Sequence, residues 1–505
     1  MTISQSASKR LDQLTFTRFA AILLVLFYHG TAGFYASFLG SSPIVTALLY
    51  SAPTAVSYLY VLSGFVMSLV YFRPNEKFDV VGYWRARFVR IYPLYIISFA
   101  LISYYYLDGL LRIKPQKILA NLFVLQAWIP AYSQSFNYAS WSMTVEFFFY
   151  ALFPFLTMWA YRQSTRKLIW MALGFWAVSQ LVYYVLWTGY YPEYSGLLVY
   201  FPLFHLNSFV MGVTGGIWYL REGRLQPLKP VTILLALAGS ALLAAGYTVA
   251  STVYYPSLPH RLQPMGGLLA PILILFVVSL ALDKSWLSVK LLDRPAPVAL
   301  GETAYAIYIL HVPVAWLYER ALDASSLSNP RSVFDVTFLP MMMTIGLIAH
   351  FYVDTPLRRW LKRMLARISE PLFLLDLGII ALSAFIIFRL RFGDGRVYLS
   401  YREMERVFFW SAFFIRPMLS VMFNSLHPAS LRLPIGQMAR RVFFSATLGS
   451  LIVAAVVFTG YLTGWLENFP RSIFALDWLI VLSLSLLARL ALRRFHRLQP
   501  APLPA

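Results

Sequence analysis

Four side chains that carry charge or protons occur inside stretches that otherwise resemble membrane-spanning helices. Arg18 and His29 lie in the first apolar stretch, Glu146 lies in a later one, and His311 lies in a third. A charged side chain at the centre of a bilayer costs about 2.5–3.5 kcal/mol on insertion scales, so such groups are usually retained for a function. Because histidine and glutamate exchange protons readily, the pattern indicates proton-transfer chemistry or charge movement inside a membrane.

The expected topology places three of these groups at a similar depth, in the outer half of the membrane. His29, Glu146 and His311 come from three separate spans, so they could meet in one cavity. A histidine paired with a carboxylate is a usual general base, because the carboxylate fixes the tautomer and stabilises the imidazolium. The alternative for each histidine is a structural hydrogen bond between helices, worth about 0.6 kcal/mol. We expect that structural role for His350, and His205 has no companion motif.

A second cluster could bind phosphate. Arg85, Arg87 and Arg90 lie in the segment YWRARFVRIYP, where Arg87 and Arg90 share one helix face. Clustered guanidinium groups bind phosphates through paired hydrogen bonds. Anchoring against anionic lipid is the alternative, and on the arginines alone it is the stronger one.

Composition excludes a soluble protein. The chain has 505 residues, of which 59% are hydrophobic and only 12% are charged, whereas soluble chains carry roughly 25% charged residues. The net charge of +21 comes from basic residues at alternate gaps between spans, the positive-inside pattern, which argues against nucleic-acid binding. The absence of cysteine excludes thiolate metal sites and a cysteine acyl-enzyme, and we expect no metal site.

Apolar periodicity predicts an all-α polytopic membrane protein, with a ten-span bundle over residues 1–367 and a four-span extension over 368–505. The predicted spans are 14–34, 46–71, 91–111, 139–160, 168–188, 200–220, 230–250, 264–282, 296–319 and 334–356, then 371–389, 405–424, 442–464 and 472–490. The stretch 112–137 is predicted to be interfacial or re-entrant. Lys9 and Arg10 precede the first span without a cleavage site after it, so we expect both chain ends in the cytoplasm.

Two glycine patterns predict close helix contacts. Gly212 and Gly216 form a GxxxG pattern, and Gly64 lies in the middle of the second span. Small residues at this spacing let helix backbones approach in a membrane. By contrast, the last four spans show no residue pattern for chemistry, so we expect them to serve docking or stability.

Several motifs recur in a characteristic order along residues 10–367. They include an arginine and a histidine in the first span, an SGF element, a segment ending in RIYPLY, the segment NYASWSMTVE, the segment GETAYAIYILHVP and the segment YVDTP. The matching residues are Arg18, His29, Ser63, Gly64, Phe65, Arg87, Arg90, Pro93, Tyr95, Asn137, Trp141, Ser142, Glu146, Gly301, Tyr305, Tyr308, His311, Pro313, Tyr352, Asp354 and Pro356. In this order they resemble membrane-bound acyltransferase family 3, with Met143, Thr303 and Asp354 departing from the commoner residues.

The resemblance implies acyl transfer to a hydroxyl of an envelope or secreted polysaccharide, or of its lipid-linked precursor. It implies acyl-CoA, usually acetyl-CoA, as a co-substrate from the cytoplasm, no permanently bound cofactor, and residence in a bacterial inner membrane. His29, Glu146 and His311 would then be catalytic, with His29 either deprotonating the acceptor or carrying the acyl group. The residues expected to bind substrate or CoA are Arg18, Arg85, Arg87, Arg90, Asn137, Trp141, Ser142 and Tyr305.

Two other functions remain open at the level of sequence. The intramembrane histidines and glutamate could form the proton relay of a transporter or flippase for an envelope glycan, although no inverted repeat is apparent. The extra four helices, which faintly resemble membrane anchors of polysaccharide-assembly enzymes, could make the protein a scaffold for a polysaccharide synthase. Under each of these functions the expected partners are membrane lipid and a glycan. The last four helices are further expected to bind other polysaccharide-assembly proteins.

Overall fold

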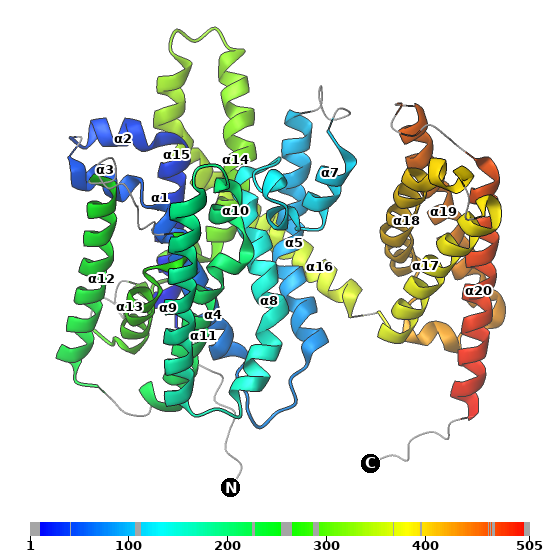
Figure 1. Ribbon diagram of the computed structural model, residues 1–505, viewed down its shortest axis with the longest axis horizontal. Coiled ribbons are helices and arrows are strands. Elements are labelled where there is room, and N and C mark those ends of the chain that lie inside the picture. The colour runs from blue at the N-terminus through cyan, green and yellow to red at the C-terminus, as the bar shows by residue number, and fades with distance from the viewer. Residues whose placement is uncertain are drawn as a thin grey trace. The chain divides into compact units, whose positions relative to one another are not determined.

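The computed structural model describes residues 11–40, 42–106, 113–224, 228–253, 265–285, 292–366, 368–393, 396–462, 464, 466 and 470–498 (Figure 1). Over these residues the secondary structure is helical, without a strand, and eleven helices are long and apolar enough to cross a membrane. The prediction of an all-α polytopic membrane protein is therefore confirmed. Contacts divide the chain into two compact units, residues 1–358 and 359–505.

The first unit is a bundle of long helices with short helices at its edges. The helices are α1 (Gln13–Leu26), α2 (Ala32–Phe38), α3 (Pro43–Leu49), α4 (Ala52–Tyr71), α5 (Val80–Tyr105), α7 (Pro115–Leu122), α8 (Trp141–Ala160), α9 (Thr165–Tyr190), α10 (Ser195–Tyr200), α11 (Leu206–Trp218), α12 (Pro230–Val253), α13 (Ala270–Leu282), α14 (Pro295–Asp323), α15 (Pro330–Ile348) and the start of α16 (Thr355–Leu365). A π-helical turn, Phe27–Thr31, joins α1 to α2. Its wider turn holds His29, and such π-turns are frequent at functional sites.

Two predicted spans are shorter as α-helices than the sequence suggested. The spans predicted at 200–220 and 264–282 contain α11 and α13, which have 13 residues each, whereas a regular span needs about 20. Gly266 and Gly267, both with positive φ, form a turn just before α13. The predicted span 46–71 is also divided, because Tyr50 and Ser51 separate α3 from α4.

Other boundaries shift with consequences for the site. Helix α5 begins at Val80, eleven residues before the predicted span, so the arginine-rich segment is the first part of the same continuous helix. The stretch predicted to be interfacial forms the short helix α7 and two 3₁₀ turns (Figure 1). Lys9, Arg10, the predicted domain boundary at 367, the span ends at 107–111 and 264, and residue 463 of the predicted span 442–464 lie outside the described residues.

The glycines predicted at helix contacts lie between α4 and α11. A Cβ atom at Gly212 would overlap the carbonyl oxygen of Val61, and one at Gly216 would lie 2.7 Å from the carbonyl oxygen of Phe65. Gly64 faces the backbone of α11 in the same way. The prediction that these glycines allow close backbone approach is confirmed, and this contact fixes α4 beside α11.

A single added methyl group should separate these two helices. We expect Gly212→Ala to destabilise the protein by about 1–3 kcal/mol, because a rigid backbone carbonyl blocks the new group. The matched control is Gly239→Ala in α12, where an added Cβ meets nothing within 4 Å and which should be neutral or slightly stabilising. Unfolding of the two variants in detergent measures both effects, and equal stabilities would contradict the proposed packing.

The second unit is a four-helix bundle formed by α17 (Glu370–Phe392), α18 (Arg396–Met422), α19 (Ile435–Leu462) and α20 (Arg471–Leu498). Its interior holds charged pairs. Arg489 donates two hydrogen bonds of 2.8 Å to Asp376, and Arg416 forms an ion pair with Asp477. The four side chains are between 1% and 7% exposed.

These pairs correct the expectation of apolar spans without charge chemistry. They join α17 to α20 and α18 to α20 in the interior of the bundle. Ser383 donates a further bond of 2.6 Å to Asp477. Because each buried charge needs its partner, the pairs constrain the register of the helices.

Candidate functional site

The structure brings His29 and His311 together. Nε2 of His311 lies 3.1 Å from Nδ1 of His29, within hydrogen-bond distance. The two rings are nearly parallel, with an interplanar angle of 19° and centroids 5.1 Å apart. His29 is supplied by the π-helical turn after α1, and His311 by the middle of α14.

Hydrogen bonding assigns a different role to each histidine of the pair. Nδ1 of His311 contacts the backbone carbonyl of Tyr308, which can only accept, so this nitrogen carries the proton. In a neutral imidazole the remaining Nε2 is then an acceptor, and it receives the proton on Nδ1 of His29. His29 therefore keeps an unprotonated Nε2 with a free lone pair. This tautomer is assigned from the hydrogen-bond network.

The surroundings leave His29 more accessible than His311. His311 is 1% exposed, whereas His29 is only partly buried. The rings of Tyr28 and Tyr138 each lie edge-on to His29, at centroid distances of 5.1 Å. An open lone pair on the accessible ring and a buried supporting ring form a suitable arrangement for a base or nucleophile.

Glu146 has different partners from those predicted. Its carboxylate accepts a hydrogen bond of 3.3 Å from Tyr150, and it lies within electrostatic range of Arg90, Arg18 and Arg87. No described contact joins it to either histidine of the pair. Two of the three expected catalytic groups therefore meet, and Glu146 belongs instead to the arginine cluster.

The arginine cluster is built from several helices. On α5, Arg87 donates a bond of 2.9 Å to the hydroxyl of Tyr71 and lies over the rings of Tyr71, Tyr83 and Tyr150, at 5.3–5.9 Å from their centroids. One turn later, Arg90 is exposed. Arg18 approaches from α1, within electrostatic range of Arg90 and Glu146. Arg85 is partly exposed on α5.

A further arginine, which the sequence indicated only as a topology signal, joins this cluster. Arg358 in α16 forms an ion pair with buried Asp354 and lies 5.8 Å from the ring centroid of Tyr305. It also lies within electrostatic range of Arg90. With Arg18, Arg87, Arg90 and Arg358 set against Glu146 and Asp354, the cations outnumber the carboxylates. The cluster therefore favours an anion.

Other residues predicted to bind substrate mainly hold the helices in place. The side-chain amide of Asn137 donates to Ser98 and to the carbonyl of Ile309, each at 2.8 Å. Ser142 bonds to the hydroxyl of Tyr308 at 2.6 Å, and it does not orient Glu146. These bonds fix the start of α8 against α14, next to the turn that supports His311.

The aromatic residues of the predicted site are also engaged. The Tyr305 hydroxyl donates a bond of 2.5 Å to the carbonyl of Ile91, which links α14 to α5. Trp141 is buried between Tyr200 and His205, with ring centroids at 5.1 and 5.2 Å. His205 is 2% exposed and contacts the carbonyl of Val199. His350 lies 3.7 Å from Asp354, in agreement with a structural role.

Comparison with known proteins identifies relatives along most of the first unit. Residues 11–353 match the family model described as an acyltransferase domain. An acyltransferase, MdmB of Streptomyces mycarofaciens, is 27% identical over 392 residues, which cover 72% of this chain and 96% of MdmB. The exopolysaccharide production protein ExoZ of Rhizobium meliloti is 25% identical over 60% of this chain and 89% of ExoZ.

A third relative is similar over part of its length only. The O-acetyltransferase OatA of Staphylococcus aureus is 20% identical over 60% of this chain and 52% of OatA, so the similarity covers about half of that protein. No solved structure matches the chain. The family match spans well over half of the sequence. The chain therefore belongs to acyltransferase family 3 and is a multi-pass membrane acyltransferase.

Proposed function

We propose that the protein transfers an acetyl group from acetyl-CoA to a hydroxyl group of an envelope or secreted polysaccharide, or of its lipid-linked precursor. The observation that carries the proposal is the free Nε2 of His29. Hydrogen bonds from His29 to His311 and from His311 to the carbonyl of Tyr308 fix this tautomer. The names of two relatives support the acetyl group and the acceptor, because OatA is an O-acetyltransferase and ExoZ acts in exopolysaccharide production.

In this reaction His29 removes the proton from the acceptor hydroxyl, and the oxygen attacks the thioester carbonyl. The carbon–sulfur bond breaks, and the CoA thiolate takes the proton from His29. While His29 is protonated, its Nδ1–H still donates to Nε2 of His311, so the neutral partner stabilises the imidazolium. The same lone pair could instead attack the thioester and carry the acetyl group, and both routes place the reactive atom at Nε2.

The arginine cluster would hold the phosphates of the donor. Arg90 and Arg18 make no hydrogen bond or ion pair among the described residues, and both lie within electrostatic range of Glu146. Guanidinium groups bind phosphate oxygens in pairs. The relatives come from bacteria, which supports a bacterial inner membrane. The distribution of basic residues supports both chain ends in the cytoplasm, so that CoA would enter on the side of the cluster.

Arginine and lysine should differ at this cluster although both are cations. We expect Arg90→Lys to weaken CoA binding about tenfold, because a point charge cannot make the paired bonds of a guanidinium. Calorimetric titration of the purified protein with CoA measures the change. Arg166→Lys, at an exposed arginine near the start of α9 with no described contact to the cluster, is the matched control. If the parent and Arg90→Lys bind CoA with equal affinity, the cluster does not bind the donor and serves only to anchor the protein to anionic lipid.

The polysaccharide of living cells provides the test of the function as a whole. Cells that lack this protein should lose O-acetyl groups from an envelope or secreted polysaccharide, as measured by proton NMR of the purified polymer. The intact gene should restore these groups and a gene encoding His29→Ala should not. An unchanged O-acetyl content of every envelope polymer would overturn the proposal.

A further inference from the structure

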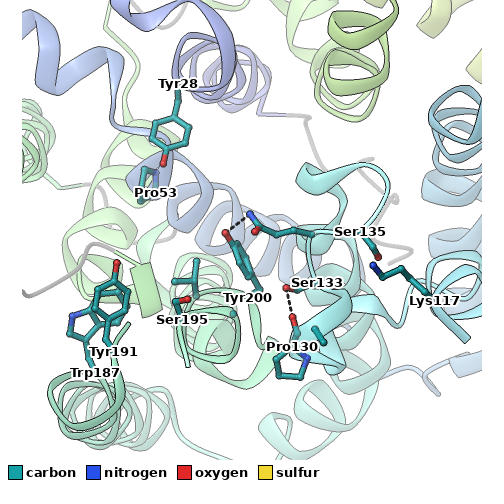
Figure 2. A pocket seen from close by; sticks show the side chains of 14 residues that line it. Tyr28, Pro53, Lys117, Pro130, Ser133, Ser135, Trp187, Tyr191, Ser195 and Tyr200 are labelled. Carbon is teal, nitrogen blue, oxygen red and sulfur yellow. Dashed lines mark hydrogen bonds between the residues drawn. The ribbon is translucent and has the colours of Figure 1, made fainter. Parts of the chain in front are cut away.

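A polar cavity of about 500 Å³ opens next to Tyr28, the residue that precedes His29 (Figure 2). Its walls come from the π-helical turn after α1, the start of α4, the end of α9, and the segments α7 and α10 with the turn at Pro130. Gly196 of α10 lies against the carbonyl of Pro130, where a Cβ atom would come within 3.2 Å. This close approach brings the two irregular segments together around one space.

Aromatic side chains line much of the cavity. Tyr28, Trp187, Tyr191 and Tyr200 surround it (Figure 2). Trp187 and Tyr191 are stacked, with ring centroids 4.1 Å apart and an interplanar angle of 15°. An aromatic ring offers a flat apolar face together with a polar edge or hydroxyl. Such surfaces suit the C–H face of a sugar ring, whose rim carries hydroxyl groups.

Polar groups between the rings complete the lining. The amide nitrogen of Gln134 donates a bond of 2.6 Å to the hydroxyl of Tyr200, which leaves the amide oxygen of Gln134 as an acceptor. Lys117 of α7 supplies the only formal charge among the residues lining the cavity. Its ammonium group lies 5.9 Å from the ring centroid of Tyr132, and no described acidic residue pairs with it. The cavity is therefore biased towards a sugar that carries an anion.

One residue, Tyr28, connects the cavity to the catalytic pair. Tyr28 lines the cavity and directly precedes His29, with their rings 5.1 Å apart. On the other side Tyr200 packs against Trp141, at the start of the helix that carries Glu146. The two histidines themselves do not line the cavity, so the Tyr28 side chain is the link between a molecule seated there and the accessible ring of the pair.

We propose that this cavity is the acceptor site, in which Tyr191 and its neighbours stack on a sugar ring while Lys117 binds an anionic group of the same glycan. The proposal rests on the function given above and specifies its acceptor as an acidic or phosphorylated glycan. The anion is either the carboxylate of an acidic sugar or the phosphate of a lipid-linked precursor. Both would pair with Lys117 in the same way.

Binding of defined oligosaccharides to the purified full-length protein tests the site without requiring turnover. The probes are maltopentaose, a pentameric galacturonate and maltopentaose 1-diphosphate, titrated by calorimetry. We expect one of the two anionic probes to bind at least tenfold more tightly than maltopentaose. The carboxylate probe would indicate an acidic sugar, and the diphosphate probe would indicate a lipid-linked acceptor.

Two variants and a control locate the binding. Lys117→Gln should remove the preference for the anion, and Tyr191→Ala should weaken all sugar binding about tenfold, with CoA affinity unchanged in both. Tyr184 is an exposed tyrosine on α9 that does not line the cavity, and Tyr184→Ala should bind like the parent. If the parent acetylates polysaccharide but both cavity variants bind and react like it, the acceptor site is elsewhere. A parent that binds CoA but acetylates nothing would reject the function instead.

Discussion

Replacement of His29 by alanine should lower acyl transfer by about 10³-fold or more while the protein still inserts and binds CoA. The variant loses the only free imidazole lone pair of the His29–His311 pair, and general base catalysis by a positioned side chain contributes about 10²–10⁴-fold. Acetyl transfer from labelled acetyl-CoA, normalised to the CoA-binding protein, measures the loss. His427→Ala in the second unit is the matched control and should retain the parent activity.

A second prediction compares variants of His311, the supporting histidine, with His29→Ala. His311→Ala should reduce transfer less than His29→Ala, because the lone pair of His29 survives without its fixed tautomer. The double variant should be no slower than His29→Ala alone, since residues that act as one unit have non-additive effects. Independent, multiplying losses would show that the two histidines do not share one function.

Breaking one buried ion pair of the second unit should be far more harmful than removing both of its members. We expect Asp376→Leu to destabilise that unit by about 3–5 kcal/mol, because it leaves Arg489 charged and buried without its partner. The double variant Asp376→Leu/Arg489→Met should recover most of this loss, since no uncompensated charge remains. Hydrogen exchange of peptides from α17 and α20, measured on the full-length protein in detergent, measures both.

An exposed pair in the same unit provides the control. Arg406 and Glu403 form an ion pair with side chains 52% and 64% exposed, and such surface pairs contribute at most about 1 kcal/mol. Glu403→Leu should therefore change stability little. If it costs as much as Asp376→Leu, burial is not the cause of the effect. If the double variant is no more stable than the single one, the pair has a role beyond charge compensation.

The meeting of His29 and His311 could be predicted from the sequence, but the partners of Glu146 could not. His29 and His311 were expected at one level, and they meet. Glu146 was expected beside them because sequence position gives only the height of a residue along its helix. The structure places Glu146 with Arg18 and Arg90, because the packing of α1, α5 and α8 decides which faces meet. Arg358 was missed for the same reason, since a basic residue after the last span has the same sequence signature as a membrane anchor.

Charges and turns account for the other differences. Asp376 and Asp477 each lie six residues inside the start of a helix, so the sequence could not distinguish an interfacial acid from a buried partner of Arg489 or Arg416. The break before α13 follows from the positive φ values of Gly266 and Gly267, which a hydropathy pattern does not contain. The cavity beside Tyr28 is formed by irregular segments distant in sequence, and no periodic signal marks them.

The most direct test of acyl transfer is to incubate the purified protein in proteoliposomes with acetyl-CoA labelled in the acetyl group and with a de-O-acetylated polysaccharide. The account predicts that label appears on the polysaccharide as an alkali-labile ester, with one CoA thiol released for each acetyl group transferred and with no transfer by His29→Ala. Movement of the glycan across the vesicle membrane without acetylation would contradict it and would identify the protein as a transporter.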